Sequence, residues 1–437
     1  MILLLVSADF LASDYCYDVE LRQAMERHEA GLADVIPVIL RPVDNWRSAP
    51  FGQLQPLPEN GKPVTTWENR DQAFVNIVQS IRKAAKELTR NSVTAEPNGS
   101  MVEFPSIARI GANPFEFGPP VSPERFYGRR QAIISVKNRI GAMTAQSINI
   151  VGLRRSGKTS LLRYIRECTE EFCQPEQTPL IISLDLQNAP YHAPAGIIEG
   201  LRRGVRRLTG VEPWPQESND DPFEVEDGLL ALRDQGYRLI VMFDEFEALS
   251  RRLELFQDWG EDWRAKNCAG LLTTVIASKS PLSEIYKMSQ LTSPFANIFG
   301  TTILGALEDD AWHELVQDGF GYEGAVGAKD LPPLQEWIDD LAGGFPFYVQ
   351  MAAAMLWQHN DPETARREFV FQATPRFQEL WADLTNPEQH ALRHATGIPD
   401  LAEPDQAIIE TLQRYGLLRF DGRLFSDAFA EFIRGQR

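Results

Sequence analysis

The chain has 437 residues, more than one ordinary hydrophobic core accommodates, so we expect about two to four domains. Apolar residues make up 43% and charged residues 24%, values typical of globular proteins, and no apolar stretch approaches the roughly 20 residues of a membrane span. The net charge of −18 opposes general attraction to nucleic acids or anionic lipids, and the four cysteines form no CxxC pair, which argues against zinc or a disulfide framework and favours a reducing cytoplasm.

Residues 1–88 are predicted to form an α/β domain. ILLLV (2–6) and VIPVIL (35–40) are continuously apolar, whereas 14–31 and 71–88 repeat apolar residues at helical spacing, and we expect one more strand before the last helix. Apolar strands alternating with helices indicate a parallel sheet covered on both faces. ILLLV is too short for a signal peptide or a membrane anchor, so we interpret it as an internal strand.

The rest of the chain is predicted to follow a linker over 89–104, where all periodicity is lost. Four apolar strands, SINIVGL, PLIISLDL, YRLIVMFDE and LTTVIAS, indicate a second α/β core over 105–304. Helices dominate from 305, and we expect a helical lid over 305–375. Over 376–437, a helix, an Asp-Gly hairpin and a last helix suggest a winged-helix domain.

The most specific motif is GLRRSGKT, which fits the P-loop pattern G-x-x-x-x-G-K-[ST] between an apolar strand and an amphipathic helix. Its glycines let backbone N–H groups turn toward phosphate oxygens, and the helix N-terminus adds partial positive charge. Lys158 would reach the β- and γ-phosphates, and the Thr159 hydroxyl would bind Mg²⁺. The loop residues that we expect to bind nucleotide are Gly152, Arg155, Ser156, Gly157, Lys158, Thr159 and Ser160.

A second acidic element ends the predicted strand YRLIVMFDE, at the sheet edge where open α/β sheets bind ligands. Asp244 would hold Mg²⁺ through water, and Glu245 would orient or deprotonate the attacking water. The alternative is that the acidic pair is only a helix cap. Lys279, after another strand, would sense the γ-phosphate, unless it is a solvated loop residue.

Together these motifs resemble the STAND branch of P-loop ATPases, signalling switches related to AAA+ proteins, over roughly residues 105–437. RFYGRR, with Gly128 and Arg129, is similar to the family's element that contacts adenine and phosphate. GGFPFYVQ is similar to its G-x-P motif, whose proline, here Pro346, packs on the base. The resemblance implies ATP or ADP with Mg²⁺ as cofactors and a winged helix behind the lid. From the residues alone, Pro346 also fits the first position of a helix.

The opening SADFLASDYCYDVEL resembles the second half of a TIR domain, a flavodoxin-like signalling module. Ser13, Tyr15, Cys16 and Glu20 occupy its S-x-W-C-x-x-E-L positions, with Tyr15 in place of Trp and one extra residue before Glu20. In TIR enzymes that cleave NAD⁺ this glutamate is catalytic, so the resemblance implies that role for Glu20 and NAD⁺ as a substrate. Without the resemblance, Glu20 is a polar residue on an amphipathic helix.

A full TIR domain begins with two further strand–helix units, so this segment corresponds to a partial domain. We expect either a recorded start placed too late or a degenerate remnant; the third explanation is a half-domain completed by a partner chain. In each case ILLLV would occupy an uncovered sheet edge.

The main functional hypothesis is a slowly hydrolysing STAND-type switch of bacterial defence, in which ATP-dependent homo-oligomers control the TIR segment and the trigger is unknown. The alternative is an AAA+-like ATPase whose winged helix binds DNA, supported by Arg202, Arg203, Arg206 and Arg207 on one helix face. That face is also explained as a solvated basic surface. A third hypothesis is an ATP-gated NADase assembled between copies. No membrane partner is expected.

Overall fold

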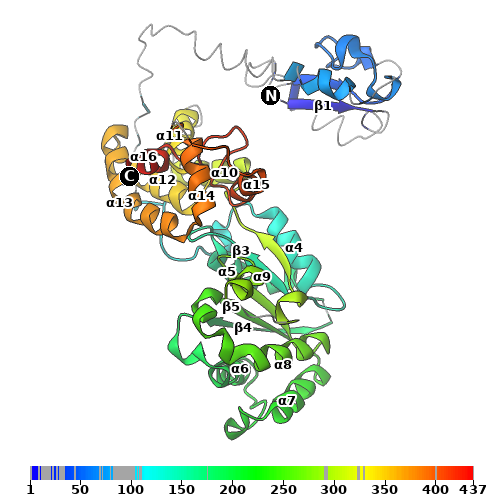
Figure 1. The fold of residues 1–437 in the computed structure, drawn as a ribbon, viewed down its shortest axis with the longest axis vertical. Helices are drawn as coiled ribbons and strands as arrows, with labels where there is room; N and C mark the ends of the chain where they lie inside the picture. Colours follow the sequence, from blue (N-terminus) through cyan, green and yellow to red (C-terminus); the bar gives the residue numbers. More distant parts are fainter. Residues whose placement is uncertain are drawn as a thin grey trace. The chain divides into compact units, whose positions relative to one another are not determined.

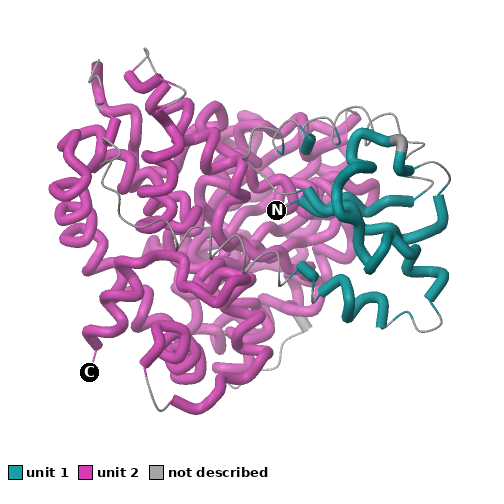
Figure 2. Tube along the Cα trace, turned by 90° about the horizontal axis from the view of Figure 1, so that it is seen from above, with its two compact units in different colours: residues 1–102 teal, residues 103–437 magenta. Residues whose placement is uncertain are grey.

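The computed structural model describes two compact units, residues 1–102 and 103–437, and each is described here by itself (Figure 2). The described residues are 2–7, 10, 21, 24–25, 28, 35–43, 46–67, 70, 72–78, 80–81, 104–105, 107, 111–174, 176–289, 294–321, 325–327, 330–398 and 401–436. The predicted helix over 14–31 and most of the predicted linker lie largely outside them.

The first unit contains two parallel strands, β1 (Ile2–Val6) and β2 (Val35–Ile39), as the apolar runs predict. The expected further strand is wrong for the described stretch 46–67, which has three short 3-10 turns and one bridge between Val38 and Leu57. The reason is chemical: Pro56, Pro58 and Pro63 have no N–H and cannot extend a strand ladder.

The second unit is built on a five-stranded sheet in the order β4-β5-β6-β3-β7, with all paired strands parallel (Figure 1). The strands are β3 (Ile148–Val151), β4 (Thr178–Asp185), β5 (Tyr237–Asp244), β6 (Thr273–Ser278) and β7 (Gly300–Ile303). The first four coincide with predicted strands. The short β7, GTTI, was not predicted because it has a single large apolar residue.

Helices cover both faces of this sheet, as continuous apolar strands require. On β5, Leu239, Val241 and Phe243 enter one core with α6 (Pro194–Thr209), α7 (Pro222–Asp234), α8 (Gln257–Cys268) and α9 (Leu282–Met288). Ile240 and Met242 alternate with them and enter the opposite core with α4 (Arg130–Ile140) and α5 (Lys158–Glu167). The P-loop strand therefore lies in the middle layer of a three-layer fold.

The remaining helices are α10 (Asp309–Gly321), α11 (Leu331–Ala342), α12 (Pro346–His359), α13 (Pro362–Asp383), α14 (Asn386–Ala395), α15 (Gln406–Arg414) and α16 (Asp427–Gly435). They share one core, which also includes Val151 and Leu153 beside the P-loop. The predicted boundary between lid and winged helix, at 375, falls inside α13. Lid and C-terminal helices therefore pack as one body.

The C-terminal segment has the predicted order of helix, hairpin and helix. Leu418 and Leu424 form an antiparallel bridge, Arg419 N–H donates to the Arg423 carbonyl at 2.7 Å, and Gly422 has a φ of 88° at the turn. The assignment of this segment as a winged helix stays a prediction.

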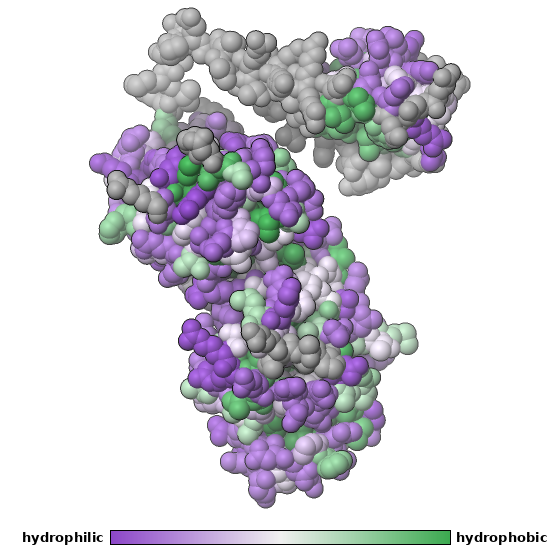
Figure 3. All heavy atoms as spheres, in the orientation of Figure 1, coloured by the Kyte–Doolittle hydropathy of each residue, from purple (hydrophilic) through white to green (hydrophobic). Residues whose placement is uncertain are grey.

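The surface of the second unit is mostly hydrophilic in the view of Figure 3, with hydrophobic atoms in small groups. Among the described helices, none is both long enough and apolar enough to cross a membrane.

We predict that Phe425→Ala lowers the free energy of unfolding of the second unit by about 3–5 kcal/mol. Phe425 is fully buried, and its ring lies 4.7 Å from Phe345 and 5.3 Å from Phe429, so truncation leaves a cavity in the shared core. Urea unfolding followed by tryptophan fluorescence measures the change. Phe420→Ala, in the same hairpin but 93% exposed, is the control and should change stability by less than about 0.5 kcal/mol. Equal effects would contradict the packing described.

Candidate nucleotide-binding site

The loop between β3 and α5 has the shape that its glycines permit. A side-chain carbon on Gly152 would lie 2.4 Å from Ser156 Oγ and 2.9 Å from the Leu304 carbonyl oxygen, so no larger residue fits there. Gly157 has a φ of 95°, in the left-handed region that favours glycine, and α5 begins at the next residue. The first N–H groups of α5 lack partners within the helix and face the loop with partial positive charge. The loop can therefore hold an anion.

Lys158 lies inside this loop with only 5% of its surface exposed. Its Nζ donates to the carbonyl oxygens of Gly152, at 2.8 Å, and Leu153, at 3.2 Å. Burial lowers the pKa of Lys158, whereas the nearby carboxylates, Glu247 first among them, act in the opposite direction. The Lys158 ammonium therefore lies beside the loop, within reach of any phosphate that the loop binds.

Thr159 and Asp244 meet across the ends of α5 and β5. Thr159 Oγ1 donates to Asp244 Oδ2 at 2.8 Å, and Asp244 Oδ1 accepts the backbone N–H of Glu245 at 2.9 Å. Burial raises the pKa of the Asp244 carboxyl, and the Thr159 hydrogen bond opposes that rise. Glu245 has a φ of 53°, a strained conformation for a residue with a side chain, and lines the adjoining cavity.

These oxygen donors fit Mg²⁺ but not a metal held by protein ligands alone. A Mg²⁺ ion that is bound with a nucleotide keeps water and phosphate ligands and needs few protein oxygens. The Thr159 hydroxyl and the Asp244 carboxylate, which lie 2.8 Å apart, can supply those few. Among the described residues, no group of three or more His, Cys, Asp or Glu could hold a metal ion. Thr159 and Asp244 would therefore bind Mg²⁺ together with a bound nucleotide.

Glu247 is a site residue that the sequence reasoning missed. Its Oε1 is buried without a hydrogen-bond partner among the described residues, and burial together with Glu245 raises the pKa of its carboxyl. The sequence does contain a sign of this residue, since Glu247 is the third acidic residue of DEFE, two positions after Glu245.

Three cations around the P-loop are ion-paired with the C-terminal end of α13. Lys279 Nζ lies 2.9 Å from Asp383 Oδ2, Arg154 Nε lies 3.2 Å from the same oxygen, and Arg155 lies 3.1 Å from Glu379. We call Glu379 and Asp383 the acidic end of α13. The solvated-loop interpretation of Lys279 is wrong, because this side chain is 20% exposed and paired. Its predicted role with the γ-phosphate stays a prediction.

Gly128 and Arg129 connect the segment before α4 to the P-loop. Arg129 is 6% exposed and donates to the carbonyl oxygens of Ser156, at 2.6 Å, and Ala306, at 3.0 Å. Burial lowers the pKa of Arg129 to about 10, and Glu308 acts against this. A side-chain carbon on Gly128 would lie 2.5 Å from Glu308 Oε2. The same oxygen accepts a hydrogen bond from the backbone N–H of Arg129 at 2.8 Å.

Pro346 is the first residue of α12 and also lies over the P-loop. A side-chain carbon built on Gly157 would lie 3.8 Å from Pro346 Cγ. Both interpretations of this proline, the helix start and the site residue, therefore agree with its position. The next residue, Phe347, packs edge-to-face on Phe117 with ring centroids 5.8 Å apart.

A cavity of about 390 Å³ lies between the P-loop and α12. The predicted site residues in its wall are Arg129, Arg155, Ser156, Gly157, Lys158, Thr159, Ser160, Glu245 and Pro346. Gly128, Gly152, Asp244 and Lys279 are adjacent but do not line it. Wall residues that were not predicted include Phe117, Tyr127, Leu315, Phe347, Gln350 and Arg376. Tyr127 lies within RFYGRR, and Phe347 and Gln350 lie within GGFPFYVQ, but neither motif had assigned them a role.

Glu20, together with Ser13, Tyr15 and Cys16, lies outside the described residues, in the first unit. Its proposed catalytic role is therefore still a prediction from the resemblance.

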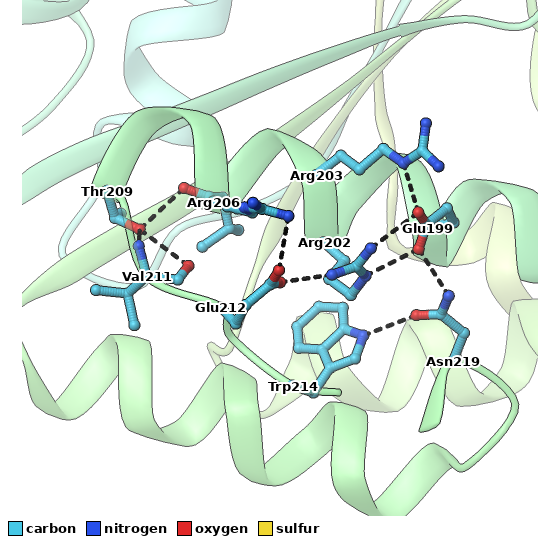
Figure 4. Close-up of polar contacts among 10 residues, drawn as sticks. Glu199, Arg202, Arg203, Arg206, Thr209, Val211, Glu212, Trp214 and Asn219 are labelled. Carbon is cyan, nitrogen blue, oxygen red and sulfur yellow. Dashed lines mark hydrogen bonds and ion pairs between the residues drawn. The ribbon is translucent and has the colours of Figure 1, made fainter. Parts of the chain in front are cut away.

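Two carboxylates pair with three of the four arginines on the basic face of α6. Figure 4 shows Arg202 between Glu199 and Glu212, with Nε and Nη1 at 2.8 and 2.5 Å from their oxygens. Arg203 also pairs with Glu199, and Arg206 pairs with Glu212. Arg202 is only 4% exposed, so this side chain is structural. The observation weakens α6 as a DNA-binding surface.

Comparisons with known proteins define the fold of the P-loop core. No family model matches the chain. A Walker-type ATPase of Pyrococcus abyssi is similar over 74% of this chain and 99% of that chain, with a TM-score of 0.51 and 16% identity. The ORC2 protein of Aeropyrum pernix, in ADPNP–ADP complexes, is similar over 73% and 96% of the chains, with a TM-score of 0.42 and 16% identity. The likeness to the Pyrococcus structure shows the fold of a P-loop NTPase, as predicted.

One curated relative is also found. It is described as the uncharacterized protein y4lF of Sinorhizobium fredii and is 55% identical over 108 residues. The match covers 25% of this chain and 33% of the relative, so the chain spans about a third of the curated relative it matches.

We predict that Asp244→Asn stabilises the nucleotide-free protein at pH 7. The raised pKa means that the folded state binds the Asp244 proton more tightly than the unfolded state does, so stability is lost as pH rises through that pKa. Asparagine keeps an acceptor oxygen for the Glu245 N–H, and its NH2 donates to the Thr159 hydroxyl, so both contacts remain without the buried charge. The same variant should bind Mg²⁺ with nucleotide about 10–100-fold more weakly.

Thermal unfolding between pH 4 and 8 and Mg²⁺ titrations in the presence of ADP measure both effects. Asp185→Asn is the matched control, because Asp185 is the register partner of Asp244 at the end of β4 and does not line the cavity. A loss of stability in Asp244→Asn at pH 7 would contradict the prediction.

Proposed function

We propose that this chain is an ATPase of the AAA+-related P-loop class. The observation that supports the proposal most directly is the convergence of Lys158, Thr159, Asp244 and Glu245 at one end of the sheet, beside a cavity closed by α12. In open α/β sheets this is the edge where ligands bind. The fold of the Pyrococcus ATPase supports the same class.

In this proposal the chain's own groups divide the work on the nucleotide. The loop N–H groups and Arg155 bind phosphate oxygens, and Lys158 exchanges two backbone carbonyls for the β- and γ-phosphates. Mg²⁺, held by Thr159 and Asp244, supplies charge neutralisation when bound. Glu245 orients the attacking water and accepts its proton.

The central test is ATP turnover by the full chain and two variants, measured as phosphate release. Lys158→Ala should lose ATP binding by at least about a hundredfold, because the buried ammonium that meets the β- and γ-phosphates is removed. Glu245→Gln should bind ATP as the wild type does but release phosphate at least about a hundredfold more slowly. Wild-type turnover in either variant would refute the assignment of that residue.

A paired control keeps the test specific. Glu261→Gln removes a carboxylate from α8, outside the cavity wall, and should leave ATP binding and turnover unchanged. Circular dichroism of each variant separates a lost site from a lost fold.

The finer signalling role is proposed from the sequence resemblance alone. In it the ATP-bound form assembles and the first unit acts as a TIR output. The third hypothesis extends it: TIR segments completed between copies cleave NAD⁺ through Glu20. Of the two hypotheses, the general AAA+-like ATPase is closer to the comparisons, because neither structure reported above is described as a signalling or TIR protein. The DNA-binding addition to that hypothesis has less support, since Glu199 and Glu212 neutralise much of the α6 face.

The signalling role predicts that Mg-ATP increases the particle mass of the wild type but not of Lys158→Ala, as measured by light scattering. It also predicts NAD⁺ loss with the wild type and none with Glu20→Ala at equal concentration. An unchanged particle mass together with intact NAD⁺ would remove the signalling role and leave the ATPase proposal standing. Salt-dependent DNA binding that disappears in Arg203→Ala/Arg207→Ala would instead favour the DNA-binding alternative.

A further inference from the structure

Gln350 has a position that the phosphate-binding residues do not explain. It lies on α12, four residues after Pro346, which is one helical turn along the same face. It is in the wall of the nucleotide cavity and also in that of a neighbouring cavity of about 460 Å³. Gln350 therefore stands where the two cavities meet.

The side chain is buried but incompletely satisfied. Gln350 is 5% exposed, and within the described part of the chain its Oε1 has no hydrogen-bond partner. A buried amide oxygen without a donor is unfavourable, and such groups in proteins usually have a partner. Oε1 itself has almost no accessible surface, so a ligand in the cavity supplies the missing donor once the carboxamide rotates and presents this oxygen to it.

The surroundings of Gln350 suit a nucleobase. Phe117, Tyr127, Leu315 and Phe347 share the cavity wall with it and offer flat or apolar surfaces. Lys158, Thr159 and the N-terminus of α5 supply the phosphate-binding part of the same wall. If the phosphates of a nucleotide bind to the P-loop, its base lies against the aromatic side of the same cavity. Gln350 offers a polar group on that side.

We propose that the Gln350 carboxamide recognises the amino-bearing edge of adenine and selects adenine nucleotides over other purines. A carboxamide presents one acceptor beside one donor, and adenine presents its 6-amino donor beside a ring-nitrogen acceptor, so two hydrogen bonds form. A purine without the 6-amino group leaves Oε1 unpaired. The corresponding edge of guanine, O6 and N7, has two acceptors and repels Oε1. This inference rests on the proposed nucleotide site and adds its base specificity.

The test compares ADP, GDP and purine riboside diphosphate, which has no substituent at position 6, by calorimetry with the full chain and MgCl₂. Diphosphates avoid turnover during the titration. The wild type should bind ADP about 10–100-fold more tightly than the other two. Gln350→Met, similar in length but without the carboxamide, should bind ADP and purine riboside diphosphate equally.

The matched control is Gln372→Met on α13, whose amide bonds to Glu368 away from the cavity and whose loss should leave the ADP preference intact. A second variant, Gln350→Glu, keeps the acceptor and should retain a preference for ADP over purine riboside diphosphate even if total affinity falls.

The outcomes separate the inference from the function beneath it. Equal binding of ADP and purine riboside diphosphate by the wild type overturns the role of Gln350 while the nucleotide site stands. A preference that persists in Gln350→Met also overturns it. Failure of the wild type to bind any diphosphate overturns the proposed function itself, and the inference with it.

Discussion

The buried ammonium of Lys158 is the constraint on which the nucleotide cavity depends. A cation removed from water needs oxygen partners, and here the curved loop supplies two of its own carbonyls. That curvature in turn requires glycine at 152 and 157, since one position has no room for a side chain and the other has a left-handed backbone. The carboxylates after β5 lie near enough to act on the same ammonium. Loop shape and acidic strand end are thus parts of one electrostatic arrangement.

The acidic end of α13 extends this arrangement to the helical body. Glu379 and Asp383 neutralise Arg154, Arg155 and Lys279, the cations that surround the loop on its outer side. Phosphate oxygens and these carboxylates are chemically equivalent partners for a guanidinium or an ammonium. In the proposed function, a bound nucleotide would compete with Glu379 for Arg155, which lines the cavity, and the helical body contacts the site through charges as well as through Pro346.

Local chemistry explains which features were predictable from the sequence. The P-loop and the Asp244–Glu245 pair were predictable because their residues are contiguous and their backbone geometry is set within a few positions. The four predicted strands were predictable from continuous apolar runs, whereas β7 has one large apolar residue and forms through pairing with β3. The third strand predicted for the first unit does not form in the described stretch 46–67, because its prolines have no N–H to donate to a strand ladder. Glu379 and Asp383 acquire their positions only through tertiary packing of α13, so no local pattern could identify them. Gln350 lies four residues after Pro346 within GGFPFYVQ, but its role depends on the cavity that packing forms around it.

The proline within α13 makes this helix easier to bend at Pro375 than elsewhere along its length. Pro375 has no N–H to donate to the preceding turn, so the helical ladder lacks one bond between the part that begins at Pro362 and the part that ends at Asp383. Phe369 before it and Phe377 after it both lie in the shared core. Bending of α13 therefore costs least at Pro375, about one turn from Glu379 and about two turns from Asp383. A rotation about that point would change the ion pairs of Glu379 and Asp383 and the packing of Phe377, while the N-terminal half of α13 would stay packed through Phe369.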